Sequence, residues 1–262
     1  MKVSAIVTTK NSGQFFKECL ISLCGCRQFY PDLEIIVVDN FSTDDTVEIA
    51  LQYADKTYCS IGPERTAQAN YGIKEASGEL IYFTGSDMTR DMEFIKDCVD
   101  KIKEGYDAVY MPVITHPRVR HFWGRVKRLE RECYLGTFIE SARFFKKSAW
   151  EQLNGFNEDM IGLEEDFQHR LDYAGYFTGR VNSREYHLHE EESLWKIFKK
   201  SFYYGLYMSA YLKKHKERGF KQLAPIRPNF NKFLKHPILL FGLVVYKLVQ
   251  YTGGGLGLLW KI

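Results

Sequence analysis

Short apolar runs alternate with amphipathic stretches along the first 111 residues of the chain. Runs rich in β-branched residues predict strands at 3–8, 35–38, 57–60, 80–84 and 108–111. Between them, apolar residues recur at helical spacing and predict helices after Ser12 and at 43–53, 66–76 and 92–104. Strands that alternate with helices in this way indicate an α/β fold with a mostly parallel sheet and right-handed crossovers.

The pattern is less regular after Pro117. Helices are predicted at 119–134, 148–153, 163–174 and 194–214, and strands at 141–145 and 177–181. From Ile238 the chain is apolar almost to its end, interrupted by Lys247 and three glycines at 253–255. A full membrane span needs about 20 apolar residues. This segment is therefore open to three interpretations, a core helix, an interfacial or re-entrant anchor, or a span, and we favour the anchor.

Composition and charge indicate which classes of protein are compatible with the sequence. The chain has 262 residues, of which 45% are hydrophobic, enough for one large α/β domain with an appendage. Its net charge of +3 is too small to indicate a nucleic-acid partner. Basic residues crowd 118–131 and 196–221, as solvated helix faces or as a surface for lipid phosphate. The six cysteines lack zinc-ligand spacing and no secretory signal precedes the first strand, so we expect reduced thiols and a cytoplasmic location.

Two carboxylates follow predicted strands. Asp39 ends the run 35–38, and Ser42 with Asp45 resembles a capping box at the start of the next helix. Ligands of open α/β sheets bind outside the carboxyl ends of the strands, where Asp39 can accept hydrogen bonds from a nucleobase or a sugar hydroxyl. Asp87 follows the strand 80–84 and can hold a divalent cation, although a turn or helix-capping role is also open. We expect both carboxylates at one edge of the sheet.

Four segments in this order resemble the nucleotide-binding half of family 2 glycosyltransferases of the GT-A fold. They are Thr8–Asn11, Val38–Thr46, Ala67–Ile73 and Ala76–Asp87. The resemblance covers about residues 1–190 and implies a Rossmann-like, mostly parallel sheet flanked by helices. It implies a nucleotide-sugar-binding half at 1–112 and an acceptor-side half at 113–190. Residues 191–262 would then form a helical, membrane-associating extension.

The resemblance also implies roles for individual residues. The nucleotide site would consist of Thr8, Thr9, Asn11, Asp39, Asn40, Ser42, Gln68, Asn70 and Ser86. Asp39 would recognise the base, while Asn70 and more loosely Gln68 would approach the diphosphate. Asp87 would be the last carboxylate of the family's metal motif and would hold Mg²⁺ or Mn²⁺. Gly85 stands where the first aspartate of that motif is usual, so the metal would depend on Asp87 with His187 or His189.

An acidic segment, Glu164-Glu165-Asp166, resembles the one that supplies the family's general base. The base deprotonates the acceptor hydroxyl on the face opposite the leaving diphosphate. Alignment on Arg170 puts Glu164 at the base position, whereas alignment on the acidic pair puts Asp166 there, and we favour Asp166. These acids can equally be ordinary partners of a helix N-terminus. By the same resemblance, Arg143 would contact a phosphate of the acceptor.

The resemblance predicts an inverting glycosyltransferase that moves a sugar from a nucleotide diphosphate sugar. A UDP-sugar is favoured and a GDP-sugar is the second choice. The acceptor would be a hydroxyl or a lipid-linked phosphate or glycan, such as a polyprenyl-phosphate-linked one, at the cytoplasmic face of the membrane. The alternative is a non-catalytic protein of the same fold that binds sugar nucleotides or acts as a scaffold. No nucleic-acid partner is expected.

Overall fold

The computed structural model describes residues 1–59, 65–137, 140–159, 163–215 and 229–260. The chain forms two compact units. Unit 1 comprises Met1–Val113, Ser141–Glu158 and Leu163–His187, and unit 2 comprises Ile114–Glu140, Asp159–Gly162 and Leu188–Ile262. The functional divisions placed at residues 112 and 190 stay predictions, since the two units are defined by packing alone.

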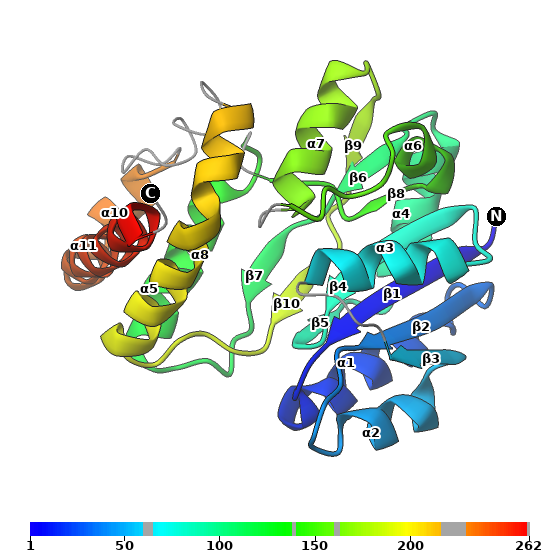
Figure 1. The fold of residues 1–262 in the computed structure, drawn as a ribbon, viewed down its shortest axis with the longest axis horizontal. Helices are drawn as coiled ribbons and strands as arrows, with labels where there is room; N and C mark the ends of the chain where they lie inside the picture. The colour runs from blue at the N-terminus through cyan, green and yellow to red at the C-terminus, as the bar shows by residue number, and fades with distance from the viewer. Residues whose placement is uncertain (60–64, 138–139, 160–162, 216–228, 261–262) are drawn as a thin grey trace. The chain divides into compact units, whose positions relative to one another are not determined.

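A seven-stranded sheet with the order β3-β2-β1-β4-β8-β6-β9 forms the centre of unit 1 (Figure 1). Its strands are β1 (Val3–Thr9), β2 (Leu33–Asp39), β3 (Lys56–Cys59), β4 (Leu80–Gly85), β6 (Ala108–Tyr110), β8 (Phe144–Lys146) and β9 (Thr178–Arg180). Only β8 runs antiparallel to its neighbours, β4 and β6. The prediction of an α/β fold with a mostly parallel sheet is confirmed.

Helices cover both faces of this sheet. They are α1 (Gly13–Cys26), α2 (Thr46–Tyr53), α3 (Arg65–Glu75), α4 (Phe94–Lys103), α6 (Lys147–Gln152) and α7 (Leu163–Tyr173). Residues of α1, α2 and α4 share one hydrophobic core with the sheet, and residues of α3, α6 and α7 share the other. Every residue of β1 and β2 is therefore buried, which explains the continuous apolar runs Ala5–Val7 and Ile35–Val38 within them.

The structure differs from the predicted elements at two places near the sheet edge. Helix α2 begins at Thr46 rather than at residue 43, because the Ser42 hydroxyl donates to Asp39 instead of capping the helix. Two short strands, β5 (Met88–Arg90) and β10 (Glu185–His187), pair antiparallel with His187 opposite Met88. With three residues each, they are too short to show an alternating pattern. A further short strand, β7 (Val113–Thr115), lies where the chain leaves unit 1.

Unit 2 is helical. It contains α5 (Phe122–Tyr134), α8 (Leu194–Lys214), α10 (Asn231–Leu234) and α11 (Pro237–Trp260), around a core that includes Val126, Leu129, Ile197, Phe233 and Leu243. Helix α11 is the predicted long apolar helix at the C-terminal side, and it is long and apolar enough to cross a membrane.

Glu34 links three parts of unit 1, and its ionisation should stabilise the fold. This buried carboxylate accepts hydrogen bonds from the Ser4 and Ser77 hydroxyls and pairs with Lys56 at 2.9 Å. Burial alone would raise the pKa of Glu34, but the Ser4, Lys56 and Ser77 contacts outweigh it and lower the pKa to about 2. Because the unfolded chain then binds the proton more readily, the free energy of unfolding should fall as the pH drops from about 4.5 to about 2.

We expect this single group to contribute about 3 kcal/mol to that loss. Urea unfolding at a series of pH values should show a flatter acid limb for Glu34→Gln than for the parent protein. The exposed Glu48→Gln serves as the matched control. An acid limb in Glu34→Gln as steep as that of the parent would contradict the assignment.

Candidate functional site

Three neighbouring strands of unit 1 end at one edge of the sheet. In the parallel register, Thr9 of β1 lies opposite Asp39 of β2, and Thr8 lies opposite Gly85 of β4. Asp87 follows two residues beyond the end of β4. Asp39 and Asp87 therefore flank the end of β1 from its two sides, at the edge where ligands of α/β sheets bind.

The Asp39 carboxylate is held by the loop that follows it. It accepts the backbone N–H of Ser42 at 2.7 Å and also the Ser42 hydroxyl. Asn11, with a φ of 49°, donates its own backbone N–H to the Ser42 oxygen at 2.7 Å and accepts the N–H of Thr43 at 2.8 Å. The Asn40 N–H donates to the Thr9 carbonyl at 3.0 Å. A carboxylate has about four acceptor positions, and Ser42 takes two of those of the fully buried Asp39.

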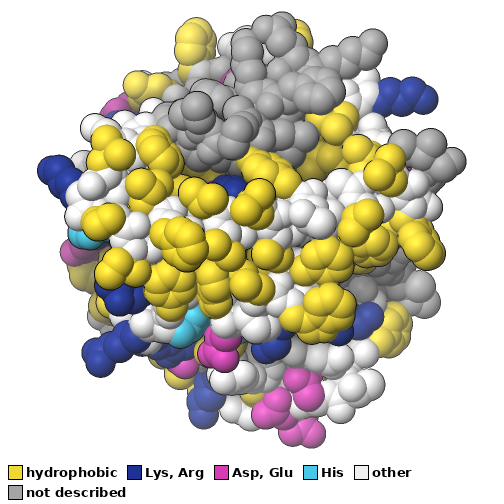
Figure 2. Space-filling view, turned by 90° about the vertical axis from the view of Figure 1, so that its left-hand side faces the viewer, with side chains coloured by type: hydrophobic (Ala, Val, Ile, Leu, Met, Phe, Trp, Pro, Cys, Tyr) yellow, Lys and Arg dark blue, Asp and Glu magenta, His cyan; other side chains and the backbone are white. Residues whose placement is uncertain are grey.

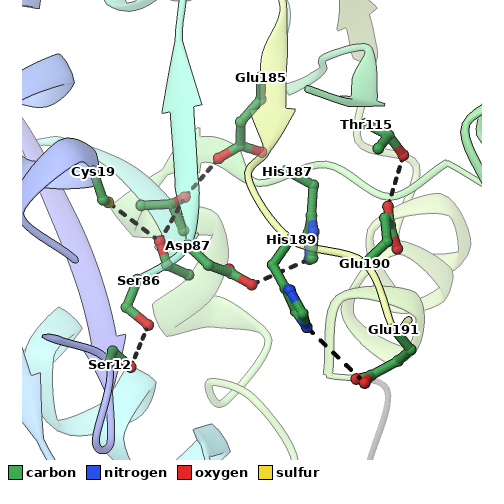
Figure 3. A network of polar contacts seen from close by, with 12 residues as sticks. Ser12, Cys19, Ser86, Asp87, Thr115, Glu185, His187, His189, Glu190 and Glu191 are labelled. Carbon is green, nitrogen blue, oxygen red and sulfur yellow. Dashed lines mark hydrogen bonds and ion pairs between the residues drawn. The ribbon is translucent and has the colours of Figure 1, made fainter. Parts of the chain in front are cut away.

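Asp87 and His187 point toward each other, with 3.3 Å between a carboxylate oxygen and Nε2 (Figure 3). The strand β10 supplies His187, because its pairing places that residue opposite Met88. Ser86 turns the other way and donates its hydroxyl to Ser12 at 2.8 Å. His189 belongs to unit 2, where its Nε2 lies 4.0 Å from Glu191. Of the two candidate histidines, the structure thus pairs His187 with Asp87.

Asp87 and His187 could supply only some of the ligands of a metal ion. Among the described residues, no group of three or more metal-ligating side chains lies together. A carboxylate and an imidazole nevertheless fit a divalent cation whose remaining positions are filled by phosphate oxygens and water. At Gly85 an added Cβ would lie 3.2 Å from an Asp87 carboxylate oxygen. With glycine at position 85, Asp87 and His187 together with the donor phosphates are the fitting combination.

Glu164 in the first turn of α7 is connected to the strand edge through Arg65. The Arg65 Nε donates to the Thr8 hydroxyl at 3.2 Å, and its Nη1 lies 3.3 Å from Glu164. Arg143 approaches the same carboxylate at 3.5 Å. Burial would raise the pKa of Glu164, but the guanidinium groups of Arg65 and Arg143 outweigh it and hold that pKa below its usual value. Glu164 is therefore ionised beside the end of β1.

Arg65 was not singled out in the sequence, since a lone arginine at the start of a helix carries no distinctive signal. The pKa of Glu165, the next residue after Glu164, is shifted in the opposite direction from that of Glu164. Burial and the adjacent Glu164 charge raise the pKa of Glu165 to about 7. The two adjacent glutamates therefore titrate in different pH ranges, and only Glu164 carries ion pairs to both arginines.

Asp166, the residue favoured from the sequence as the base, is fully buried. Its carboxylate accepts the Arg170 Nε–H at 2.8 Å, and Arg170 also donates to the Leu153 carbonyl at 2.6 Å. The Asp166 side chain has no exposed surface, whereas the Glu164 side chain is 11% exposed. The contacts give Asp166 a structural position, holding α7 to the chain that precedes it.

Asp166→Asn should accordingly destabilise the protein. Removing the charge leaves Arg170 partly buried beside a neutral amide, and breaking a buried ion pair costs about 3–5 kcal/mol. Thermal unfolding should show a clear fall in Tm relative to the exposed control Asp172→Asn on the same helix. An unchanged Tm combined with lost turnover would instead return the base role to Asp166.

Gln68 and Asn70 also have structural positions rather than the ligand contacts implied by resemblance. Both Gln68 N–H groups are used, because its Nε2 donates to the Thr9 and Val38 carbonyls at 2.9 Å each. Asn70 donates to the Phe156 carbonyl and to Glu158, and it accepts the Phe156 N–H at 2.9 Å. Gln68 therefore joins the ends of β1 and β2, and Asn70 anchors the segment after α6. Neither amide has a donor left for a diphosphate.

Arg143 lies between two acidic residues. Besides Glu164, it pairs with Glu185 of β10 at 3.1 Å. Glu185 is fully buried and accepts the hydroxyls of Tyr82 and Thr84, both at 2.5 Å. These ion pairs occupy the guanidinium that the sequence assigned to an acceptor phosphate. Glu185 was missed because an isolated glutamate in a short connecting segment has no distinguishing pattern.

The chain is similar to several known proteins. The chain is 34% identical over 119 residues to the poly(ribitol-phosphate) β-N-acetylglucosaminyltransferase TarS of Staphylococcus aureus, covering 42% of this chain and 20% of TarS. The crystal structure of TarS residues 1–349 with UDP-GlcNAc matches 97% of this chain and 75% of that one, with a TM-score of 0.57 and 19% identity. The chain thus matches only a fifth of the length of full TarS.

Two further proteins are similar over most of this chain. A GalNAc(5)-diNAcBac-PP-undecaprenol β-1,3-glucosyltransferase of Campylobacter jejuni is 26% identical over 247 residues, 87% of this chain and 74% of that protein. The mannosyltransferase PcManGT of Pyrobaculum calidifontis, solved with GDP-Man and Mn²⁺, has a TM-score of 0.61 at 17% identity, covering 97% of this chain and 73% of that one. The two structural matches establish a common GT-A fold. The family model for glycosyl transferase family 2 matches residues 4–163, more than half of the sequence, and the chain belongs to that family.

Proposed function

We propose that this family 2 protein is an inverting glycosyltransferase that transfers a sugar from a nucleotide diphosphate sugar to a hydroxyl group. The observation that carries the proposal is the Arg65 bridge, which connects Thr8 at the strand edge to the ionised Glu164. This contact supports Glu164 as a candidate base beside the edge at which the donor would bind. A UDP-sugar is favoured because TarS was solved with UDP-GlcNAc, and a GDP-sugar is the second choice because PcManGT was solved with GDP-Man.

Each residue of the strand edge then has a defined task. Asp39 accepts hydrogen bonds from the nucleobase, positioned by Ser42 and Asn11. Asp87 and His187 hold Mg²⁺ or Mn²⁺ together with the donor phosphates. The metal ion, when bound, neutralises charge on the departing diphosphate.

Glu164 is the proposed general base. It accepts the proton of the acceptor hydroxyl as that oxygen attacks the anomeric carbon and the bond to the diphosphate breaks. Arg65 and Arg143 keep its carboxylate ionised, and the Arg65 contact with Thr8 fixes its position relative to the donor edge. Asp166 stabilises the helix that carries Glu164.

A lipid-linked acceptor at the cytoplasmic face of a membrane fits the remaining features. The Campylobacter jejuni protein, similar over 87% of this chain, has an undecaprenol-linked glycan in its name. The described residues of unit 2 carry twice as many lysines and arginines as aspartates and glutamates. Positive charge of this kind is attracted to lipid phosphate groups.

The alternative is a protein that binds sugar nucleotides without turnover, which Gly85 at the usual aspartate position favours. Calorimetric titration with UDP-GlcNAc, UDP-glucose and GDP-mannose in Mn²⁺, run beside transfer and hydrolysis assays, separates the two. Binding accompanied by transfer or slow hydrolysis supports the enzyme. Tight donor binding with neither reaction, in the presence of a polyprenyl-phosphate-linked glycan, would support the alternative.

A further inference from the structure

Helix α11 has two faces of different character. One face is buried in unit 2, while the other carries exposed apolar residues from end to end. The exposed residues are Ile238, Phe241, Val244, Leu248, Leu256, Leu259 and Trp260. Figure 2 shows hydrophobic side chains gathered in a band on this side of the molecule. With a rise of 1.5 Å per residue, the 24-residue helix presents this row over about 36 Å.

The buried face of α11 is fixed to its neighbours by close backbone contact. An added Cβ at Gly257 would lie 2.1 Å from the Phe202 carbonyl oxygen of α8, and one at Gly253 would lie 2.7 Å from the Phe198 carbonyl oxygen. From the side of α8, a Cβ at Gly205 would lie 2.2 Å from the Gly254 carbonyl oxygen. No larger residue fits at these positions without separating α8 from α11.

A buried charge fixes the same face to α5. Lys247, the one charged residue of α11, forms an ion pair with Glu130 and donates to Gln250 at 2.8 Å. Glu130 is only 1% exposed and also pairs with Lys127 at 2.7 Å. Without Lys247, the buried Glu130 carboxylate would lose one of its two lysine partners. A buried charge that is poorly paired destabilises the fold. Helix α11 is therefore committed on one side to protein contacts.

This packing is incompatible with a helix that crosses a bilayer. Helix α8 lies along α11 and carries five lysines, at 196, 199, 200, 213 and 214. If α11 crossed the membrane in this arrangement, α8 and the Glu130 cluster would enter the hydrocarbon with it. Charged side chains are strongly disfavoured there. The exposed row, in contrast, contains no charged residue.

We propose that α11 lies in the plane of a membrane surface and inserts its exposed apolar row into the headgroup–acyl boundary of a bilayer rich in anionic phospholipid. The positive charge of helices α8, α10 and α11 favours an anionic lipid surface as the partner of this apolar row. Helices α8, α10 and α11 contain no aspartate or glutamate, and every charged residue in them is a lysine. A one-sided apolar helix with basic neighbours is the pattern of an interfacial, membrane-attached helix.

Aromatic residues add a second argument for a lipid surface. Trp260 is 80% exposed at the end of α11, and Trp195 is 62% exposed at the start of α8. Tryptophan favours the boundary between headgroups and acyl chains, where its ring is buried and its N–H remains hydrated. Docking of α11 requires no catalytic activity, so its test is independent of the test for sugar transfer.

Vesicle flotation with the full chain tests the proposal. The parent protein should float with vesicles of phosphatidylglycerol and phosphatidylethanolamine, bind weakly to phosphatidylcholine alone, and be released from the bilayer by alkaline carbonate. The double variant Phe241→Ser/Leu248→Ser removes side chains that are 69% and 63% exposed, and should reduce the partition coefficient at least tenfold. Leu51→Ser on α2 in unit 1, also 69% exposed, is the matched control and should bind like the parent.

Three results would overturn the proposal. Equal flotation of the double variant and the parent would show that the apolar row does not contact lipid. Retention in the bilayer after alkaline carbonate would indicate a crossing helix. Concentration-dependent dimerisation in sedimentation experiments, abolished by the double variant and accompanied by no vesicle binding, would show that a second copy of the chain covers this face. Circular dichroism of each variant verifies that the fold is retained, which is expected because the substituted side chains are exposed.

Discussion

Glu164→Gln is expected to reduce kcat for sugar transfer by about a hundredfold to ten-thousandfold, with little change in donor affinity. The substitution removes the proton acceptor at the start of α7 and keeps the size of the side chain. Arg65 and Arg143 remain in place beside an uncharged amide, and Arg143 retains its ion pair with Glu185. Single-turnover kinetics with a saturating donor, together with calorimetric donor binding, separates the chemical step from binding.

Glu165→Gln is the matched control for this experiment, because it removes the adjacent carboxylate in the same helical turn. It should retain most of the activity. It should also alter the pH dependence near 7, because the pKa of Glu165 is raised to about 7 and its charge opposes that of Glu164. Full activity in Glu164→Gln, or a loss confined to Glu165→Gln, would transfer the base role away from Glu164.

Asp87→Asn should give the second largest effect, a loss of metal-dependent transfer of about a hundredfold or more. Its carboxylate and the His187 imidazole are the two side chains that the structure brings together for a cation. An amide oxygen is a weaker, uncharged ligand, and even changes outside the ligand shell cost about 10- to 100-fold in metal affinity or activity. Activity measured across a Mn²⁺ titration should shift to higher metal concentrations, and His187→Ala should shift it in the same direction.

Ser86→Ala provides the control for Asp87→Asn. It changes the adjacent residue, whose hydroxyl bonds to Ser12 rather than to the metal pair. The control should titrate with Mn²⁺ like the parent. Parent-like transfer by Asp87→Asn at low Mn²⁺ would remove Asp87 from the metal site.

The sequence predicted the parts of the fold that are governed by burial. Strands β1 and β2 are buried at every position, so their apolar runs end visibly before Thr8 and before Asp39. The same pattern located Asp87 after β4, because the chain must leave the sheet where its apolar run ends. The α/β fold, the sheet edge and its two carboxylates were therefore predictable from local pattern alone.

Side-chain partners that are far apart in the sequence were not predictable. Asn70 donates a hydrogen bond to the Phe156 carbonyl, 86 residues away in the sequence. Arg65 donates one to the Thr8 hydroxyl, 57 residues away. The sequence places three acids side by side, Glu164, Glu165 and Asp166. It does not show which of them pairs with an arginine of the same helix and which pairs with an arginine of another segment. Only the packing of α7 against the sheet separates Glu164, which meets Arg65, from Asp166, which meets Arg170.

The interleaved path of unit 2 limits how this protein can be divided for study. A fragment ending near residue 190 would keep α5 with Glu130 but lose Lys247, one of the two lysines that neutralise that carboxylate. It would also expose the apolar side of α5 that α11 covers through Gly242. Such a truncated protein should be prone to aggregation even though its seven-stranded sheet is complete, so biochemical dissection is better done by point substitution than by trimming.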